Sequence, residues 1–113
     1  MLIYRWRQMN RFESDFWKQK SKVEVWFEDG RLFASSDGKV LPDPESLMDV
    51  AAIDAQEENG RIVRLHVDKK DGTKDIYSGL DDMDAFAAEF KINVPQAKFR
   101  RVRLGFPMKL KEV

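Results

Sequence analysis

The sequence contains no cysteine, a single histidine and no long apolar run. The absence of cysteine excludes a disulfide framework, thiolate metal sites and a cysteine nucleophile. One histidine excludes a metal site built from several imidazoles. No apolar stretch approaches the roughly 20 residues of a membrane-spanning helix, and the amino end lacks the continuous apolar run of a signal peptide. These absences predict a cytoplasmic protein.

The length of 113 residues fits a single domain, 1–113, that can bury a core without disulfides or metals. Twenty basic and twenty acidic residues give a formal net charge of zero. Basic residues nevertheless gather in the first 22 residues and in the tail, 96–113, whereas acidic residues crowd the middle of the chain. This asymmetry indicates a nucleic-acid or anionic-surface contact at the ends, or basic ends that neutralise the acidic middle. The zero net charge favours neutralisation.

Three Asp-Gly pairs are flanked by residues typical of strands, and they are Asp29-Gly30, Asp37-Gly38 and Asp71-Gly72. Asp-Gly readily adopts the positive φ angles of a two-residue type I′ turn, so each pair predicts a β-hairpin. The first turn aligns a salt pair at the rim and apolar pairs further in, namely Glu28 with Arg31, Phe27 with Leu32, Trp26 with Phe33 and Val25 with Ala34.

The third Asp-Gly pair predicts a hairpin with Lys70 opposite Thr73 and Val67 opposite Ile76. In the strand before it, apolar and polar residues alternate, so the two faces differ. One face carries Val63, Leu65 and Val67, and the other carries Arg64, His66 and Asp68. The alternation predicts a half-buried antiparallel ribbon.

Segment 43–59 supports two interpretations. Its alanines, Asp43 as a cap before Pro44, and the closing Asn59-Gly60 are typical of a helix. Alternation over 50–54 favours a strand instead, with Asn59-Gly60 as a hairpin turn. The local pattern leaves both interpretations open.

Residues 81–93 predict an amphipathic helix. Asp81 or Asp82 caps the first turn, and Pro95 ends the helix. Apolar residues recur at the spacing i, i+3, i+4 and i+7, at Met83, Phe86, Ala87 and Phe90.

Both ends of the chain have a strand pattern. Residues 2–8 alternate, which predicts a strand at the amino end. In the tail, Val102, Leu104 and Phe106 alternate with Arg101, Arg103 and Gly105. The alternation predicts an added strand in the tail, and a helix that starts at Pro95 is the alternative.

A meander of antiparallel strands that ends in one helix resembles the pleckstrin-homology (PH) superfold. The stretch from Ile76 to Phe86, Ile-Tyr-Ser-Gly-Leu-Asp-Asp-Met-Asp-Ala-Phe, resembles the last strand and capping helix of bacterial PH-like domains, and the resemblance covers about residues 50–91. It implies an α+β fold in which an antiparallel meander forms a half-open barrel or sandwich, with one amphipathic helix near the carboxyl end. It also implies a strand at 49–56, because the barrel of the family has a strand there.

PH-like domains are mostly binding and scaffolding modules, so the resemblance implies a non-catalytic role. Phosphoinositide-binding members carry basic residues in their first hairpin, a region that here holds Lys18, Lys20 and Lys22. The following strand, 23–27, lacks their Arg-x-Arg pattern. The resemblance therefore does not imply lipid binding.

No catalytic motif accompanies the candidate residues. His66 has no Gly-x-Ser-x-Gly elbow to serve, so we predict a surface or rim histidine rather than part of a triad. Asp81, Asp82 and Asp84 lack the spacing of a calcium loop and are explained by helix capping. The turn at 68–72 has one glycine and no following helix, so it predicts a solvated turn, not a phosphate cradle. We predict no metal, no cofactor and no enzymatic activity; an enzyme that uses His66 and carboxylates is the third class considered.

Arginines interleave with aromatic residues at both ends of the chain, which makes five of them a candidate partner surface: Arg5, Arg7, Arg100, Arg101 and Arg103. We predict an interaction or scaffolding module whose partner is a protein, or a second copy of the chain bound through an edge strand or the tail. The alternative is a binder of nucleic acid or an anionic surface, in which these arginines neutralise phosphates while rings stack on bases.

Overall fold

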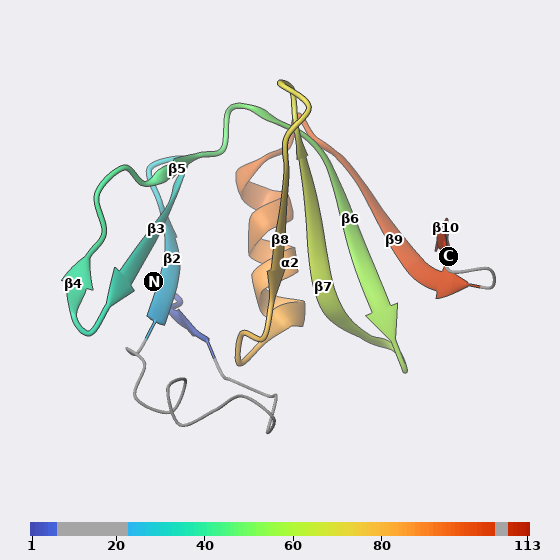
Figure 1. Cartoon of the computed structure of the whole chain (residues 1–113), viewed down its shortest axis with the longest axis horizontal. Helices are drawn as coiled ribbons and strands as arrows, with labels where there is room; N and C mark the ends of the chain where they lie inside the picture. Colours follow the sequence, from blue (N-terminus) through green and yellow to red (C-terminus); the bar gives the residue numbers. More distant parts are fainter. Residues whose placement is uncertain (7–22, 106–108) are drawn as a thin grey trace.

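The computed structural model describes residues 1–6, 23–105 and 109–113. Within these ranges, two five-stranded sheets flank one helix, α2 (Met83–Asn93), as Figure 1 shows. The predicted α+β class is confirmed. The basic residues Lys18, Lys20 and Lys22 lie outside the described ranges.

The first sheet comes from the amino-terminal half of the chain. Its strands are β1 (Tyr4–Arg5), β2 (Val23–Glu28), β3 (Arg31–Ser36), β4 (Lys39–Val40) and β5 (Glu45–Ser46). Their order is β1-β2-β3-β4, and β5 also pairs with β3. The predicted register of the β2–β3 hairpin is confirmed from Val25↔Ala34 to Glu28↔Arg31. Its turn has φ angles of 50° at Asp29 and 70° at Gly30, as a type I′ turn requires.

The second sheet contains β6 (Val50–Glu58), β7 (Arg61–Lys69), β8 (Lys74–Ser78), β9 (Lys98–Gly105) and β10 (Lys109–Glu112). Their order is β10-β9-β6-β7-β8. The strand interpretation of segment 43–59 is therefore correct from Val50 onward, and Asn59-Gly60 forms the turn into β7. Strand β6 lies between antiparallel β7 and parallel β9, so partners on both sides override the helical propensity of its alanines.

The predicted register of the β7–β8 hairpin is wrong by one residue. Val67 pairs with Asp75, not with Ile76. The cause lies in the turn, where the Asp71 carboxylate accepts hydrogen bonds from the Thr73 N–H at 2.9 Å and the Thr73 hydroxyl at 2.6 Å. This local bonding favours a longer turn than the two-residue type I′ form.

A bulge corrects the predicted face of Val63. The register passes from Gln56↔Arg64 to Glu57↔Ile62, so Val63 is the extra residue of β7. The bulge moves Ile62 into the core, where it is 7 % exposed, and leaves Val63 only partly buried.

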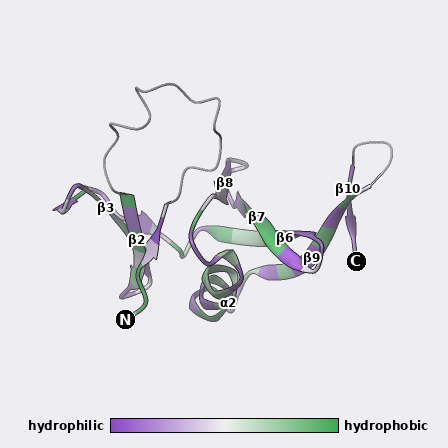
Figure 2. Cartoon of the chain, turned by 90° about the horizontal axis from the view of Figure 1, so that it is seen from below, coloured by the Kyte–Doolittle hydropathy of each residue, from purple (hydrophilic) through white to green (hydrophobic). Residues whose placement is uncertain are grey.

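Helix α2 lies in the angle between the two sheets (Figure 2). Asp82 is the N-cap and accepts a hydrogen bond from the Ala85 N–H at 3.0 Å. The predicted apolar face is confirmed, since Met83, Phe86, Ala87 and Phe90 are the buried residues of the helix. Rings from both sheets meet this face in a cluster of five aromatic residues, which are Tyr4, Phe27, Tyr77, Phe86 and Phe90.

Strand β1 joins the two sheets. It pairs with β2, and its Arg5 carbonyl accepts a hydrogen bond of 2.8 Å from the Asp81 N–H just beyond β8. The Tyr4 hydroxyl donates to Oε1 of Glu89 at 2.5 Å, which ties β1 to α2. Of the predicted amino-terminal strand, Tyr4–Arg5 is present, and residues 7 and 8 lie outside the described ranges.

Candidate interaction surface

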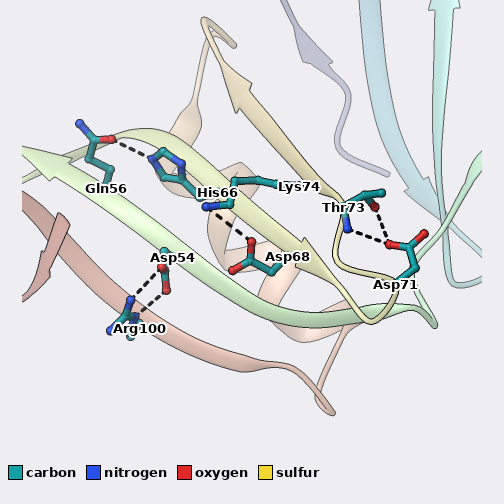
Figure 3. Close-up of polar contacts among 8 residues, drawn as sticks. All are labelled: Asp54, Gln56, His66, Asp68, Asp71, Thr73, Lys74 and Arg100. Carbon is teal, nitrogen blue, oxygen red and sulfur yellow. Dashed lines mark hydrogen bonds and ion pairs between the residues drawn. The ribbon is translucent and has the colours of Figure 1, made fainter. Parts of the chain in front are cut away.

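His66 is buried, so the prediction of a surface or rim histidine is wrong. The residue lies on the face of β7 that points away from α2 and is 9 % exposed. Its Nε2 lies 2.8 Å from Oε1 of Gln56 (Figure 3), and its register partners on the flanking strands are Asp54 and Ile76.

The environment of His66 keeps the imidazole neutral. Burial lowers the pKa of His66 below its ordinary value of 6.5, and the charge of Lys74 lowers it further, against an opposing effect of Asp54. The hydrogen-bond partner of the ring is an amide, whereas a catalytic base is oriented by a carboxylate. The His66–Gln56 pair is therefore a satisfied polar contact within the sheet.

The three acids near the start of α2 serve separate backbone groups. Asp82 caps the helix, Asp81 accepts from the Arg5 N–H at 3.1 Å, and Asp84 accepts from the Ile62 N–H at 3.0 Å. Because each carboxylate joins a different element, the three do not converge on one point. In the described part of the chain, no group of three or more His, Cys, Asp or Glu side chains is arranged to hold a metal ion.

Two of the candidate arginines are neutralised within the second sheet. Arg100 donates two hydrogen bonds to the Asp54 carboxylate, at 2.7 and 3.0 Å (Figure 3), and this contact raises the pKa of Arg100. Arg101 forms an ion pair with Glu57. Successive strand residues point to opposite faces, so Arg100 and Arg101 do not share a surface.

The remaining candidate arginines do not complete a patch. Arg5 lies on β1 of the other sheet, 3.4 Å from Glu24, and Arg7 lies outside the described ranges. Arg103 forms no ion pair with any described residue. It lines an open groove of about 590 Å³ at the β6–β7 turn, together with Arg64, Glu58 and Leu104.

The outer edge of β10 is protected against self-pairing. The Val113 N–H bonds to the Arg101 carbonyl, so the backbone groups of Leu110 and Glu112 face away from β9. If two copies paired antiparallel through this edge, their outward-facing residues would have to pair with one another. Pairing Leu110 with Glu112 of the other copy sets Lys111 opposite Lys111. Pairing Leu110 with Leu110 sets Lys109 opposite Lys111. Edge lysines of this kind block strand addition.

The opposite edge of the second sheet, β8, carries one lysine, Lys74, and no described strand covers it. The Lys69 N–H bonds to the Thr73 carbonyl at 2.9 Å, which fixes the alternation of hydrogen bonds along the β7–β8 ladder. It follows that Asp75 and Tyr77 bond to β7, whereas the backbone groups of Ile76 and Ser78 point outward. Among the described residues, no strand pairs with these outward groups.

An apolar seam runs beside this edge, between β8 and the first sheet. We use the word seam for two adjacent hollows that share Val25 and Tyr77. The first has a volume of about 210 Å³ and is also lined by Leu32, Ala34, Leu41, Pro42, Asp43, Pro44 and Glu45. The second has a volume of about 300 Å³ and is also lined by Trp6, Val23, Ile76, Ser78 and Leu80. The rim of the seam exposes apolar side chains, with Ile76 57 % and Leu41 44 % exposed.

The two ends of the seam differ in charge. Asp43 and Glu45 line the first hollow. Lys69 forms an ion pair with Glu45, and its Nζ lies 3.0 Å from the Asp75 carboxylate. Three carboxylates against one ammonium leave this end with two negative charges. The second hollow has no charged residue among its described lining.

The sequence predicted binding through an edge strand or the tail, but it did not predict which strand would lie at an open edge. The alternation of β8 was visible, but an open edge is defined by the absence of a neighbouring strand, which depends on the tertiary fold. No local signal pointed to it, because the predicted register placed Ile76 opposite Val67 on the apolar face, whereas Ile76 lies opposite His66.

Comparisons with known proteins add no relative. No protein-family model matches the chain, and no curated protein or solved structure is significantly similar to it. No helix in the described ranges is long and apolar enough to cross a membrane.

Proposed function

We propose that the chain is a non-catalytic protein-interaction module of the PH-like class, which binds an extended segment of a partner protein at the outer edge of β8. The observation that carries the proposal is the row of outward-facing backbone groups at Ile76 and Ser78, beside an apolar seam. In β-augmentation, main-chain hydrogen bonds supply affinity and side-chain hollows supply selectivity. The β8 edge offers both.

The PH-like assignment is supported by the order of the elements. An antiparallel meander, β6–β7–β8, leads into one amphipathic helix, and that helix fills the angle between two sheets. Strands β9 and β10 follow the helix and extend the second sheet beyond β6. The chain thus occupies one edge of this sheet with its own tail, and no strand of the described residues occupies the β8 edge.

The non-catalytic role is supported by how the candidate side chains are used. His66 bonds to an amide, Asp82 caps α2, and Asp81 and Asp84 bind backbone N–H groups. Each therefore has a structural task that a catalytic role would disrupt.

Selection of peptides from a random library tests the proposal, with the whole chain and its Ile76→Pro variant as parallel targets. The Ile76 N–H points outward, so proline removes an edge donor without removing a hydrogen bond to β7. Ile76→Val keeps the donor and an aliphatic side chain in the seam, and is the matched control. We expect the wild type and Ile76→Val to enrich the same extended peptides, and Ile76→Pro to lose them by at least about tenfold.

Enrichment of the same peptides by Ile76→Pro would contradict binding at this edge, as would the absence of any enriched peptide. Urea unfolding of each variant checks that the fold is intact. A comparable free energy of unfolding for Ile76→Pro and Ile76→Val shows that the lost binding reflects the edge.

The alternative function is binding of nucleic acid or an anionic surface, and the groove that holds Arg64 and Arg103 favours it. Neither guanidinium forms an ion pair with a described residue, so both can meet phosphates. This function predicts that the chain binds a 20-nucleotide single strand with an affinity that falls steeply with salt and is weakened by Arg103→Ala. Binding that is absent, or insensitive to salt, contradicts it.

A further inference from the structure

The β8 edge allows the partner segment to be described in more detail, and this inference rests on the proposed function. The direction of the segment comes from the pairing already present at the carboxyl end of β8. There Trp6 forms an antiparallel bridge with Leu80, and the Arg5 carbonyl accepts from the Asp81 N–H. A segment that continues this pairing along β8 toward Lys74 also runs antiparallel to β8.

The side chains of the segment follow from the two hollows. In a strand, residues i and i+2 point to the same side and lie about 7 Å apart. The hollows are adjacent, since both are bounded by Val25 and Tyr77. Alternate residues of one extended segment therefore enter successive hollows, whose walls are mostly aliphatic or aromatic. Apolar residues at these positions bury the most surface.

The charge of the segment follows from the unequal ends of the seam. The end near the start of β8 carries two uncompensated negative charges from the set Asp43, Glu45, Asp75 and Lys69. An antiparallel segment places its carboxyl-terminal part at this end. A lysine or arginine there would be attracted by Asp43, which forms no ion pair with a described residue.

We infer that the partner is an extended protein segment, antiparallel to β8, with apolar side chains at alternate positions and a basic residue at its carboxyl-terminal side. The backbone groups of Ile76 and Ser78 bind its main chain. The seam takes its apolar side chains, and the acidic rim takes its basic residue.

Three synthetic eight-residue peptides test the inference by titration into the ¹⁵N-labelled full chain. All three alternate valine with serine and have blocked ends. One carries arginine at its carboxyl end, the second carries arginine at its amino end, and the third has glutamine in place of arginine. We expect the first to bind most tightly, and to shift and protect the amides of Ile76 and Ser78.

Three variants isolate the contributions. Asp43→Asn keeps a residue that tolerates the φ of 59° at this position, and we expect it to weaken the first peptide about threefold and to leave the glutamine peptide unchanged. Glu58→Gln removes one charge at the distant β6–β7 turn and is the matched control, with no effect on any peptide. Ile76→Pro should abolish binding of all three.

The outcomes separate this inference from the proposed function. Equal affinity of the three peptides, or tighter binding of the peptide with arginine at its amino end, overturns the inferred charge and direction. Binding at the β8 edge itself still stands in that case if Ile76→Pro abolishes binding of the peptides. Failure of all three peptides, while library peptides bind the edge, overturns the inferred side-chain pattern alone. Association of the chain with itself at the β8 edge, seen as a mass that rises with concentration, would identify a second copy as the occupant and overturn the inference.

Discussion

At the scale of single residues, buried hydroxyl, imidazole and amide groups join elements that are distant in the sequence. The Tyr4 hydroxyl binds Glu89 on α2, and His66 on β7 binds Gln56 on β6. A buried polar group without a partner destabilises the folded state, so these pairs select the observed arrangement over alternatives that leave them unpaired. Their protonation behaviour gives two tests.

The stability of the protein should fall on mild acidification because of His66. The unfolded chain binds a proton near pH 6.5, whereas the folded ring binds it only at lower pH, since burial lowers its pKa. The stabilisation is therefore complete above pH 6.5 and is lost as the pH falls from 6.5 to the lowered pKa. We expect the free energy of unfolding of the wild type to fall more steeply than that of His66→Gln, by at most about 1.4 kcal/mol per pH unit. Parallel curves from urea unfolding between pH 7 and 5 would show that the ring titrates normally.

Both tyrosines of the chain should resist ionisation in the folded state. Burial and then the charge of Asp75 raise the pKa of Tyr77 to about 12, and burial followed by the hydrogen bond to Glu89 raises the pKa of Tyr4 further. Unfolded tyrosines ionise near pH 10, so this stabilisation is present below pH 10 and is lost as the pH rises above it. Absorbance at 295 nm should show little tyrosinate at pH 10 in native protein and about half ionisation in 6 M urea. Substantial tyrosinate in the native protein at pH 10 would place a tyrosine at the surface.

At the scale of elements, the turns were the most predictable feature. Asp29-Gly30 and Asp37-Gly38 form two-residue turns because their backbones adopt positive φ angles. Asp71-Gly72 has the same two letters but a different turn, because the Asp71 carboxylate bonds to Thr73. A dipeptide thus predicts that a hairpin exists more reliably than it predicts the register.

Replacement of a turn glycine tests this dependence on backbone conformation. Gly30→Ala places a side chain at a φ of 70°, and no other atom lies within 4 Å of the added methyl group. We therefore expect a loss of about 1 kcal/mol in the free energy of unfolding, caused by the backbone alone. Gly105→Ala is the control, since its φ is not positive and the nearest neighbours of its methyl group are the flexible Lys111 side chain, at 3.3 Å, and the Lys109 carbonyl, at 3.7 Å. Equal effects of the two variants would contradict the explanation.

The parts that the sequence did not predict depend on contacts between distant segments. Helix α2 was predictable from its cap and apolar spacing, because both are local. Strand β6 was ambiguous, because its helical alanines are overridden by pairing with β9, more than 40 residues away in the chain. The bulge at Val63 and the burial of His66 likewise depend on neighbouring strands. The candidate arginines were visible in the sequence, but their neutralisation by Asp54 and Glu57 was not.

At the scale of the whole molecule, the two outer edges of the second sheet differ. Lysines protect β10, whereas β8 offers outward backbone groups beside an apolar seam. The difference predicts a chain that binds another protein through β8 and does not pair with itself through β10.

The oligomeric state tests the role of the β10 lysines. We expect sedimentation equilibrium to show a monomer at about 100 μM, because each central register brings like charges together. The double variant Lys109→Val and Lys111→Val removes the repulsion and should associate at the same concentration. Association of the wild type at low salt, where the repulsion between the charged lysines is strongest, would overturn the explanation.

The open β8 edge is the central claim, and amide hydrogen exchange in the free protein tests it most directly. The N–H groups of Asp75 and Tyr77 bond to β7, whereas those of Ile76 and Ser78 point outward. We predict slow exchange at Asp75 and Tyr77 and fast exchange at Ile76 and Ser78, a strict alternation along the strand. Slow exchange at all four amides would mean that the edge is already covered in the free protein, and it would contradict the claim.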